Sequence, residues 1–201
     1  MNQKGSMLHR ILSICLGLGM FLSGCAATRV PLFIEQDFTN RRIDAIALMP
    51  IVDVRKDKSA ANIDLEADVK IPLKKQLSRK GYSVATISSF KDGMELTPDT
   101  IAEMDEKDLA TLGPPESAYL LLFYLEDLST SYVVFSKTSK IEASAVLVDK
   151  ARSQYLWRDK CVESVGQGGL ISGFLPIQGM AVEQCILKML SGLPEKNSDH
   201  K

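Results

Sequence analysis

The residues with the most distinctive chemistry are Leu22-Ser23-Gly24-Cys25, which close an uncharged apolar run beginning at Ile11. Small residues directly before a cysteine are typical of a lipobox, the signal that directs lipid onto the cysteine thiol. The run is shorter than the roughly 20 apolar residues of a membrane-spanning helix. We therefore predict a lipoprotein signal peptide over residues 1–24 and lipidation of Cys25. An ordinary secretory leader or a short anchor is the alternative.

Lipidation of Cys25 would anchor the chain outside the cytoplasm. Each buried methylene contributes about 0.8 kcal/mol, so several acyl chains on one cysteine give stable membrane attachment. Ala26 follows the cysteine, and in bacterial lipoproteins generally the lack of Asp at this position favours the outer membrane. The expected location is the outer membrane, with the chain lipid-anchored and facing the periplasm. Residues 25–40 are then a lipidated tether, 41–192 a single domain and 193–201 a disordered tail.

Two further cysteines, Cys161 and Cys185, remain after Cys15 leaves with the leader. An even pair in an oxidising compartment can form a disulfide. The bond would close a loop of about 25 residues and stabilise the fold by roughly 3 kcal/mol if it is unstrained. Two buried reduced thiols are the alternative, because the register of a helix can easily leave the two Cα atoms too far apart.

A charged segment follows the first predicted strand and contains Asp53, Arg55, Asp57 and Lys58. The segment connects the carboxyl end of a strand to a helix, which is a usual ligand position in open α/β sheets. We therefore consider it a candidate loop for a ligand or a partner. The alternative is a solvated connection in which the charges pair with one another.

The remaining composition argues against most catalytic and nucleic-acid functions. His200 is the one histidine after Cys25, which excludes most histidine-based catalysis and most zinc sites. No Gly-x-Ser-x-Gly motif occurs, and a net charge of −1 gives no electrostatic basis for binding nucleic acid. We expect a non-catalytic protein without a cofactor or a metal site.

Hydrophobic periodicity predicts an α/β (α+β) fold with a mixed β-sheet, the element order β-α-β-α-β-β-β-α and helices packed on the sheet. Leu65, Val69, Leu73 and Leu77 form one apolar stripe, and Pro72 either kinks this helix or lies in the first turn of a helix that starts near Ile71. The closing helix is expected over residues 173–190. Strands are expected at residues 43–49, 82–87, 118–125, 132–135, 140–148 and 154–162, with a polar bend at 136–139.

Several dispersed segments resemble a family of bacterial outer-membrane lipoproteins typified by a neisserial surface-antigen lipoprotein. The resemblance covers about residues 43–190. It depends on the order and spacing of the matching segments and not on any single motif. The matching segments are Ile46 to Pro50 with Val52, Pro72-Leu73, Gly81-Tyr82-Ser83-Val84, Ser117-Ala118-Tyr119-Leu120, Ala145-x-Leu147-Val148-Asp149, Tyr155-Leu156-Trp157 and Gly168-Gly169-Leu170. The family is similar in fold to the peptidoglycan-synthase activator LpoB, the curli-export lipoprotein CsgG and the TolB amino-terminal domain.

The resemblance implies a non-catalytic envelope lipoprotein that acts as an adaptor or assembly factor. A CsgG-like lipoprotein or a peptidoglycan synthase is the implied partner, and a homodimer is a further expectation. Two alternatives remain: a structural subunit of a CsgG-like export pore and a small-ligand-binding periplasmic lipoprotein. The polar residues at 136–140 argue against the pore subunit, since a membrane-inserted hairpin needs about 9–11 residues per strand with one lipophilic face.

Overall fold

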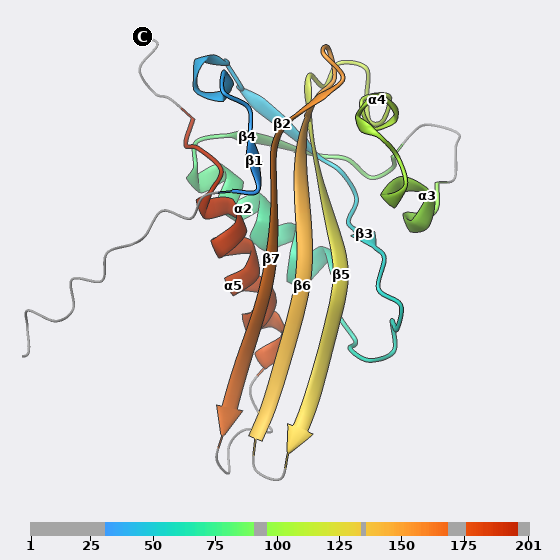
Figure 1. Cartoon of the computed structure of the whole chain (residues 1–201), viewed down its shortest axis with the longest axis vertical. Coiled ribbons are helices and arrows are strands. Elements are labelled where there is room, and N and C mark those ends of the chain that lie inside the picture. The colour runs from blue at the N-terminus through green and yellow to red at the C-terminus, as the bar shows by residue number, and fades with distance from the viewer. Residues whose placement is uncertain (1–30, 91–95, 134–135, 169–175, 197–201) are drawn as a thin grey trace, which may run out of the picture.

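The computed structural model describes residues 31–90, 96–133, 136–168 and 176–196. They form a seven-stranded mixed sheet in the order β1-β7-β6-β5-β2-β4, with β3 pairing β5 beside this path (Figure 1). The strands are β1 (Phe33–Ile34), β2 (Ala45–Leu48), β3 (Val52–Asp53), β4 (Ser83–Thr86), β5 (Tyr119–Val133), β6 (Ser136–Asp149) and β7 (Gln154–Gly168). The predicted fold class and the strand–helix–strand start followed by an antiparallel meander are confirmed.

The parallel part of the sheet is built around β2, which pairs β4 on one side and β5 on the other. Its central residues Ile46, Ala47 and Leu48 are all buried, as expected for a strand covered on both faces. The connecting helix α2 (Ile71–Arg79) has Pro72 in its first turn, directly after a π-helical segment, η3 (Leu65–Lys70). Of the two alternatives for Pro72, a kink or a position in the first turn of a helix, the structure shows the second.

One face of the sheet carries the larger hydrophobic cluster, beneath α2 and the closing helix α5 (Ile177–Ser191). Figure 1 shows both helices along the same side of the long strands. The predicted apolar stripe of the closing helix is buried in this cluster: Ala181, Val182, Cys185, Ile186, Met189 and Leu190. These side chains pack on β6 and β7, and this packing orients the whole helix.

The opposite face carries a smaller cluster under two short helices, α3 (Pro98–Ala102) and α4 (Glu106–Leu109). Ile101 and Leu109 pack there on β2, β5 and β6 residues such as Leu122 and Val146. The two helices lie at one end of the long strands (Figure 1). Among the described residues, helices therefore cover this face of the sheet at that end only.

The structure corrects the predicted bend at Ser136–Ser139. These residues belong to β6, and β5 continues through Tyr132 and Val133 instead of ending at Leu125. Periodicity failed here because serine and threonine occupy both faces, so no apolar alternation marks the strand. Among the described residues toward the far end of this long hairpin, serine and threonine side chains lie on both faces.

Described residues on both sides of the predicted domain, 41–192, also contact it. In the predicted tether, Phe33 and Ile34 pair with β7, and Phe38 of the short helix η2 (Phe38–Asn40) is buried in the larger cluster. In the predicted disordered tail, Leu193 is buried and the Lys196 amide donates to the Lys80 carbonyl. Apolar side chains on both sides of residues 41–192, Phe38 and Leu193, therefore contribute to the larger cluster.

Candidate functional site

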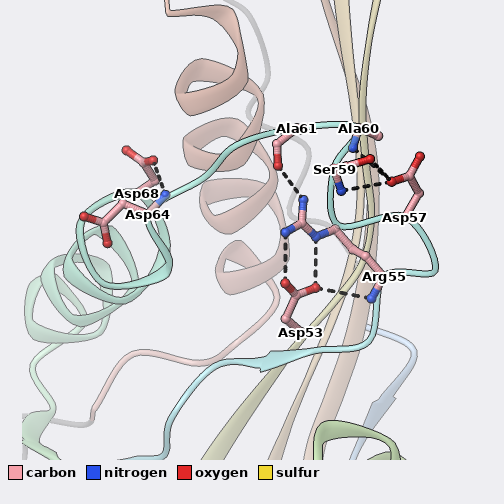
Figure 2. Close-up of polar contacts among 8 residues, drawn as sticks. All are labelled: Asp53, Arg55, Asp57, Ser59, Ala60, Ala61, Asp64 and Asp68. Atoms are coloured by element: carbon pink, nitrogen blue, oxygen red, sulfur yellow. Dashed lines mark hydrogen bonds and ion pairs between the residues drawn. The ribbon is translucent and has the colours of Figure 1, made fainter.

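Of the four predicted loop residues, Asp53 ends β3 and the other three lie between β3 and η3. They divide into a buried pair and an exposed pair, and Figure 2 shows the contacts of Asp53, Arg55 and Asp57. Asp53 and Arg55 are 8% and 7% exposed. Asp57 and Lys58 are exposed. The predicted lipid attachment site, Cys25, and the predicted signal peptide lie outside the described residues.

The buried pair is a bidentate ion pair. The Arg55 Nε donates to Asp53 Oδ1 and the Arg55 Nη2 donates to Asp53 Oδ2, both at 2.9 Å. The Arg55 Nη1 also donates to the Ala61 carbonyl at 3.0 Å, which closes the loop over the pair. The Arg55 guanidinium is thus held by its own loop, and its role in this geometry is to shape the connection rather than to face a ligand.

The exposed pair is not drawn into a common site with Asp53 and Arg55. The Asp57 Oδ1 accepts from the Ser59 and Ala60 amides at 2.9 and 3.1 Å, an arrangement that forms a tight turn (Figure 2). Further along, Asp64 caps η3 by accepting from the Glu66 and Ala67 amides. Asp53, Arg55 and Asp57 therefore make local contacts of the kind that the self-pairing alternative describes. A ligand or partner at this loop stays a prediction.

The Asp53–Arg55 pair should make stability sensitive to acid. Burial raises the pKa of Asp53, but the hydrogen bonds and charge of Arg55 outweigh it, so the pKa lies below its ordinary 3.8. A depressed folded-state pKa contributes stability that is present above the unfolded value and is lost as pH falls through the folded value. We expect Asp53→Asn to lower the free energy of unfolding by about 2 kcal/mol at neutral pH, with a smaller difference below about pH 4.

Urea denaturation across this pH range checks the expectation, with Asp57→Asn as the matched control. An asparagine at 57 keeps the Oδ1 acceptor for both amides, so its midpoint should stay at the wild-type value. Equal effects of the two substitutions, or a difference that does not shrink in acid, would contradict the assigned role of Asp53.

The structure brings Cys161 and Cys185 together as a disulfide between β7 and α5. Their Cα atoms are 5.6 Å apart, which lies within the range that a disulfide requires. Both residues are fully buried in the larger cluster. The helix register, which was the open question in the sequence, places Cys185 on the face that packs against β7.

A surface feature that the sequence did not predict is the open edge of β5. β2 and β3 pair with β5 only as far as Leu125, whereas β6 pairs with the other side of β5 to Val133. Within the described ranges, no strand pairs with the outer edge of β5 from Asp127 to Val133. The same holds for β7 beyond Arg158, where the pairing with β1 stops. We call the Asp127–Val133 segment the β5 edge.

The β5 edge ends in exposed apolar side chains. Tyr132 and Val133 are 71% and 65% exposed, and the Lys137 ammonium lies 5.5 Å from the centre of the Tyr132 ring. Unpaired backbone groups beside exposed apolar side chains can accept a strand from another chain. The sequence signal was the Ser129–Ser131 run, but without apolar alternation it predicts no strand and hence no edge.

Among the helices within the described ranges, none combines the length and the apolar composition that crossing a bilayer requires. The same part of the chain contains no group of three His, Cys, Asp or Glu side chains arranged to hold a metal ion.

No protein-family model matches the chain, and no curated protein matches it. Solved structures similar to it include the lipoprotein GNA1162 from Neisseria meningitidis, at 20% identity and TM-score 0.49 over 73% of this chain and 97% of that one. PelC from Paraburkholderia phytofirmans, a dodecamer, has 13% identity and TM-score 0.48 over 77% and 91% of the two chains. The LpoB C-terminal domain from Salmonella enterica has 12% identity and TM-score 0.39 over 61% and 84%. The neisserial lipoprotein and LpoB, both named by the sequence resemblance, are thus among the similar structures.

Proposed function

We propose that this protein is a non-catalytic, lipid-anchored lipoprotein of the bacterial cell envelope that serves as an adaptor. Cys25 would carry the lipid in the outer membrane, and the folded part would face the periplasm. The domain would hold a partner protein of an envelope complex close to that membrane. Given the sequence resemblance, a CsgG-like lipoprotein or a peptidoglycan synthase is the class of partner to expect.

The observation that carries the proposal is the β5 edge. Its outer backbone N–H and C=O groups have no strand partner in the described part of the chain, and Tyr132 and Val133 lie exposed at its end. Open edges are usually blunted by charge, and here Asp127 provides a charge at one end only. A partner strand added to this edge would gain main-chain hydrogen bonds and apolar contacts together.

The anchor supports the same proposal from the sequence. Leu22-Ser23-Gly24-Cys25 predicts a lipid at the beginning of the mature chain, and the first described strand, β1, begins eight residues after it at Phe33. Eight residues span at most about 29 Å when fully extended. The domain would therefore stay near the membrane surface, where a partner in the same membrane can reach it.

Photo-crosslinking of the full chain in its own membranes tests both parts of the proposal. Benzoylphenylalanine replaces Tyr132 in one form and the exposed Lys107 of α4 in a matched control. We expect the Tyr132 position to capture an envelope protein that mass spectrometry identifies, and the Lys107 position not to do so. In a Cys25→Ser form we expect the chain to leave the membrane fraction and the crosslink to be lost.

Several outcomes would contradict the proposal. A Cys25→Ser form that stays membrane-bound would show that a lipid on Cys25 does not anchor the chain. Equal capture of a partner from positions 132 and 107 would show that the β5 edge is not the docking segment. Crosslinks to a second copy of this chain alone would indicate a homo-oligomer in place of an adaptor.

A further inference from the structure

A hollow of about 360 Å³ lies on the face of the sheet opposite α5, beside the connection between α3 and α4. Its floor comes from the three long strands and its wall includes Met104 and Val54. The polar residues around it are Tyr124, Glu126, Ser144, Tyr155 and Arg158. Its volume falls in the range of small-molecule sites, which are about 300–1,000 Å³. None of its lining residues belongs to the β5 edge or to the Asp53–Arg55 pair, although Val54 and Glu126 adjoin them in sequence.

Two irregularities in the strand register lie at the hollow. In β7, Leu156 and Trp157 are both buried in the larger cluster, so Tyr155 and Arg158 on either side of them lie on the opposite face. In β5, the register shifts between Leu125 and Asp127, and the extra residue is Glu126. Bulges of this kind re-aim side chains and are frequent beside functional sites.

The negative group that lines the hollow, the Glu126 carboxylate, is fixed in place. The Glu126 Oε1 accepts from the Ser144 hydroxyl at 2.6 Å, and the Glu126 Oε2 accepts from the Lys160 ammonium at 2.7 Å. Lys160 also pairs with the Glu142 Oε1 at 2.6 Å. Two carboxylates around one ammonium leave this group of three side chains with a net negative charge.

The positive group of the hollow is the Arg158 guanidinium. The Arg158 guanidinium makes no hydrogen bond or ion pair with any side chain in the described ranges, in contrast to the arginines at 41 and 55. The hydroxyls of Tyr124 and Tyr155 likewise have no hydrogen-bond partner among the described residues. Burial, and secondarily Tyr155, raises the pKa of Tyr124, so its hydroxyl is a protonated donor at neutral pH. The hollow therefore presents free donors and two aromatic rings.

The opposite charges of the hollow lie on the two outer strands of its floor. Arg158 comes from β7 and Glu126 from β5, and β6 runs between these strands. Neighbouring strands are about 4.8 Å apart, so β5 and β7 are about 10 Å apart, and an extended dipeptide spans about 7 Å. We propose that this hollow binds a small zwitterion of dipeptide size, with its carboxylate on Arg158, its ammonium toward Glu126, and its body against Tyr124 and Tyr155.

Calorimetric titration of the full lipidated chain in detergent tests this site with three probes. The first is glycylphenylalanine, and the others are its carboxyl-terminal amide and its N-acetyl form, each of which lacks one charge. We expect the dipeptide to bind saturably in the millimolar range or tighter. Each derivative should bind about tenfold more weakly, since each loses one charge-assisted hydrogen bond.

Matched arginine variants locate the site. Arg158→Gln should weaken binding of the dipeptide at least about tenfold. Arg152→Gln, which changes an exposed arginine in the turn between β6 and β7, should leave it within about twofold of the wild type. Tyr124→Phe removes only a hydroxyl and should weaken binding about threefold. Thermal unfolding of each variant verifies that the fold is intact.

The proposal is overturned if none of the probes binds in the millimolar range, or if the dipeptide and its two derivatives bind equally. Equal affinities of Arg158→Gln and Arg152→Gln would overturn it as well. These titrations do not involve the β5 edge or the lipid, so their failure would leave the adaptor proposal untouched.

Discussion

Replacing Arg41 by methionine should lower the free energy of unfolding by about 3–5 kcal/mol, the range for removing one partner of a buried ion pair. The Arg41 side chain is 6% exposed and lies 2.6 Å from both the Glu35 and the Asp149 carboxylates. Methionine fills a similar space but leaves two carboxylates without their cation. The substitution also loosens the segment that carries β1 and η2, because Arg41 ties this segment to the end of β6.

Arg42→Met is the matched control for this prediction. Arg42 is the next residue, its side chain is 81% exposed, and its ion pair with Asp44 is on the surface. Surface ion pairs contribute little to stability, so the control should unfold at the wild-type urea concentration. Urea denaturation of both forms, followed by circular dichroism, measures the difference. Coincident transitions for the two variants would show that the buried network does not stabilise the domain.

Removing the bond between Cys161 and Cys185 should cost about 3 kcal/mol, as estimated for a closed loop of this length. The two residues are 24 positions apart in sequence, and the bond fastens α5 to β7 inside the larger cluster. For a domain of this size, about 3 kcal/mol lowers the melting temperature by about 6–12 °C. The double variant Cys161→Ala/Cys185→Ala should show this shift relative to the oxidised wild type.

A reductant provides the internal control for the disulfide. It should lower the melting temperature of the wild type toward that of the double variant and leave the double variant unchanged. Alkylation of the unfolded, unreduced wild type followed by mass spectrometry should find neither cysteine modified. Two alkylated cysteines in that sample, or an equal effect of reductant on both proteins, would support the reduced pair instead.

Local sequence patterns determined the parts of the fold in which one face of an element is buried. The apolar stripe of the closing helix was predicted apart from Ile177, and the first strand was predicted from its apolar run, because burial imposes a period of 3.6 or a continuous apolar stretch. Pro72 left two possibilities, a kink or a helix start near Ile71, and the structure has the start. Periodicity failed where both faces are polar, at Ser136–Ser139.

Charges in sequence could not show which groups would pair. Asp53, Arg55, Asp57 and Lys58 are adjacent in the chain and looked like one site, yet tertiary packing buries the first two as an ion pair and leaves the others exposed. Arg158 gave no sequence signal at all. It is left uncommitted in the hollow because a bulge at Leu156 sets the faces of β7, which no local pattern encodes.

The sequence by itself determined the order of the main strands and helices, apart from the short β1 and β3, and it identified the two cysteines able to pair, since each depends on residue type and local spacing. It also predicts the lipid site at Cys25. Only the tertiary structure decided the edges of the sheet. Whether a strand edge is open depends on how far its neighbours extend, and β2 and β3 stop beside Leu125 while β5 continues to Val133. The same long-range pairing decided the hollow around Tyr124 and Arg158, because three strands distant in sequence supply its floor.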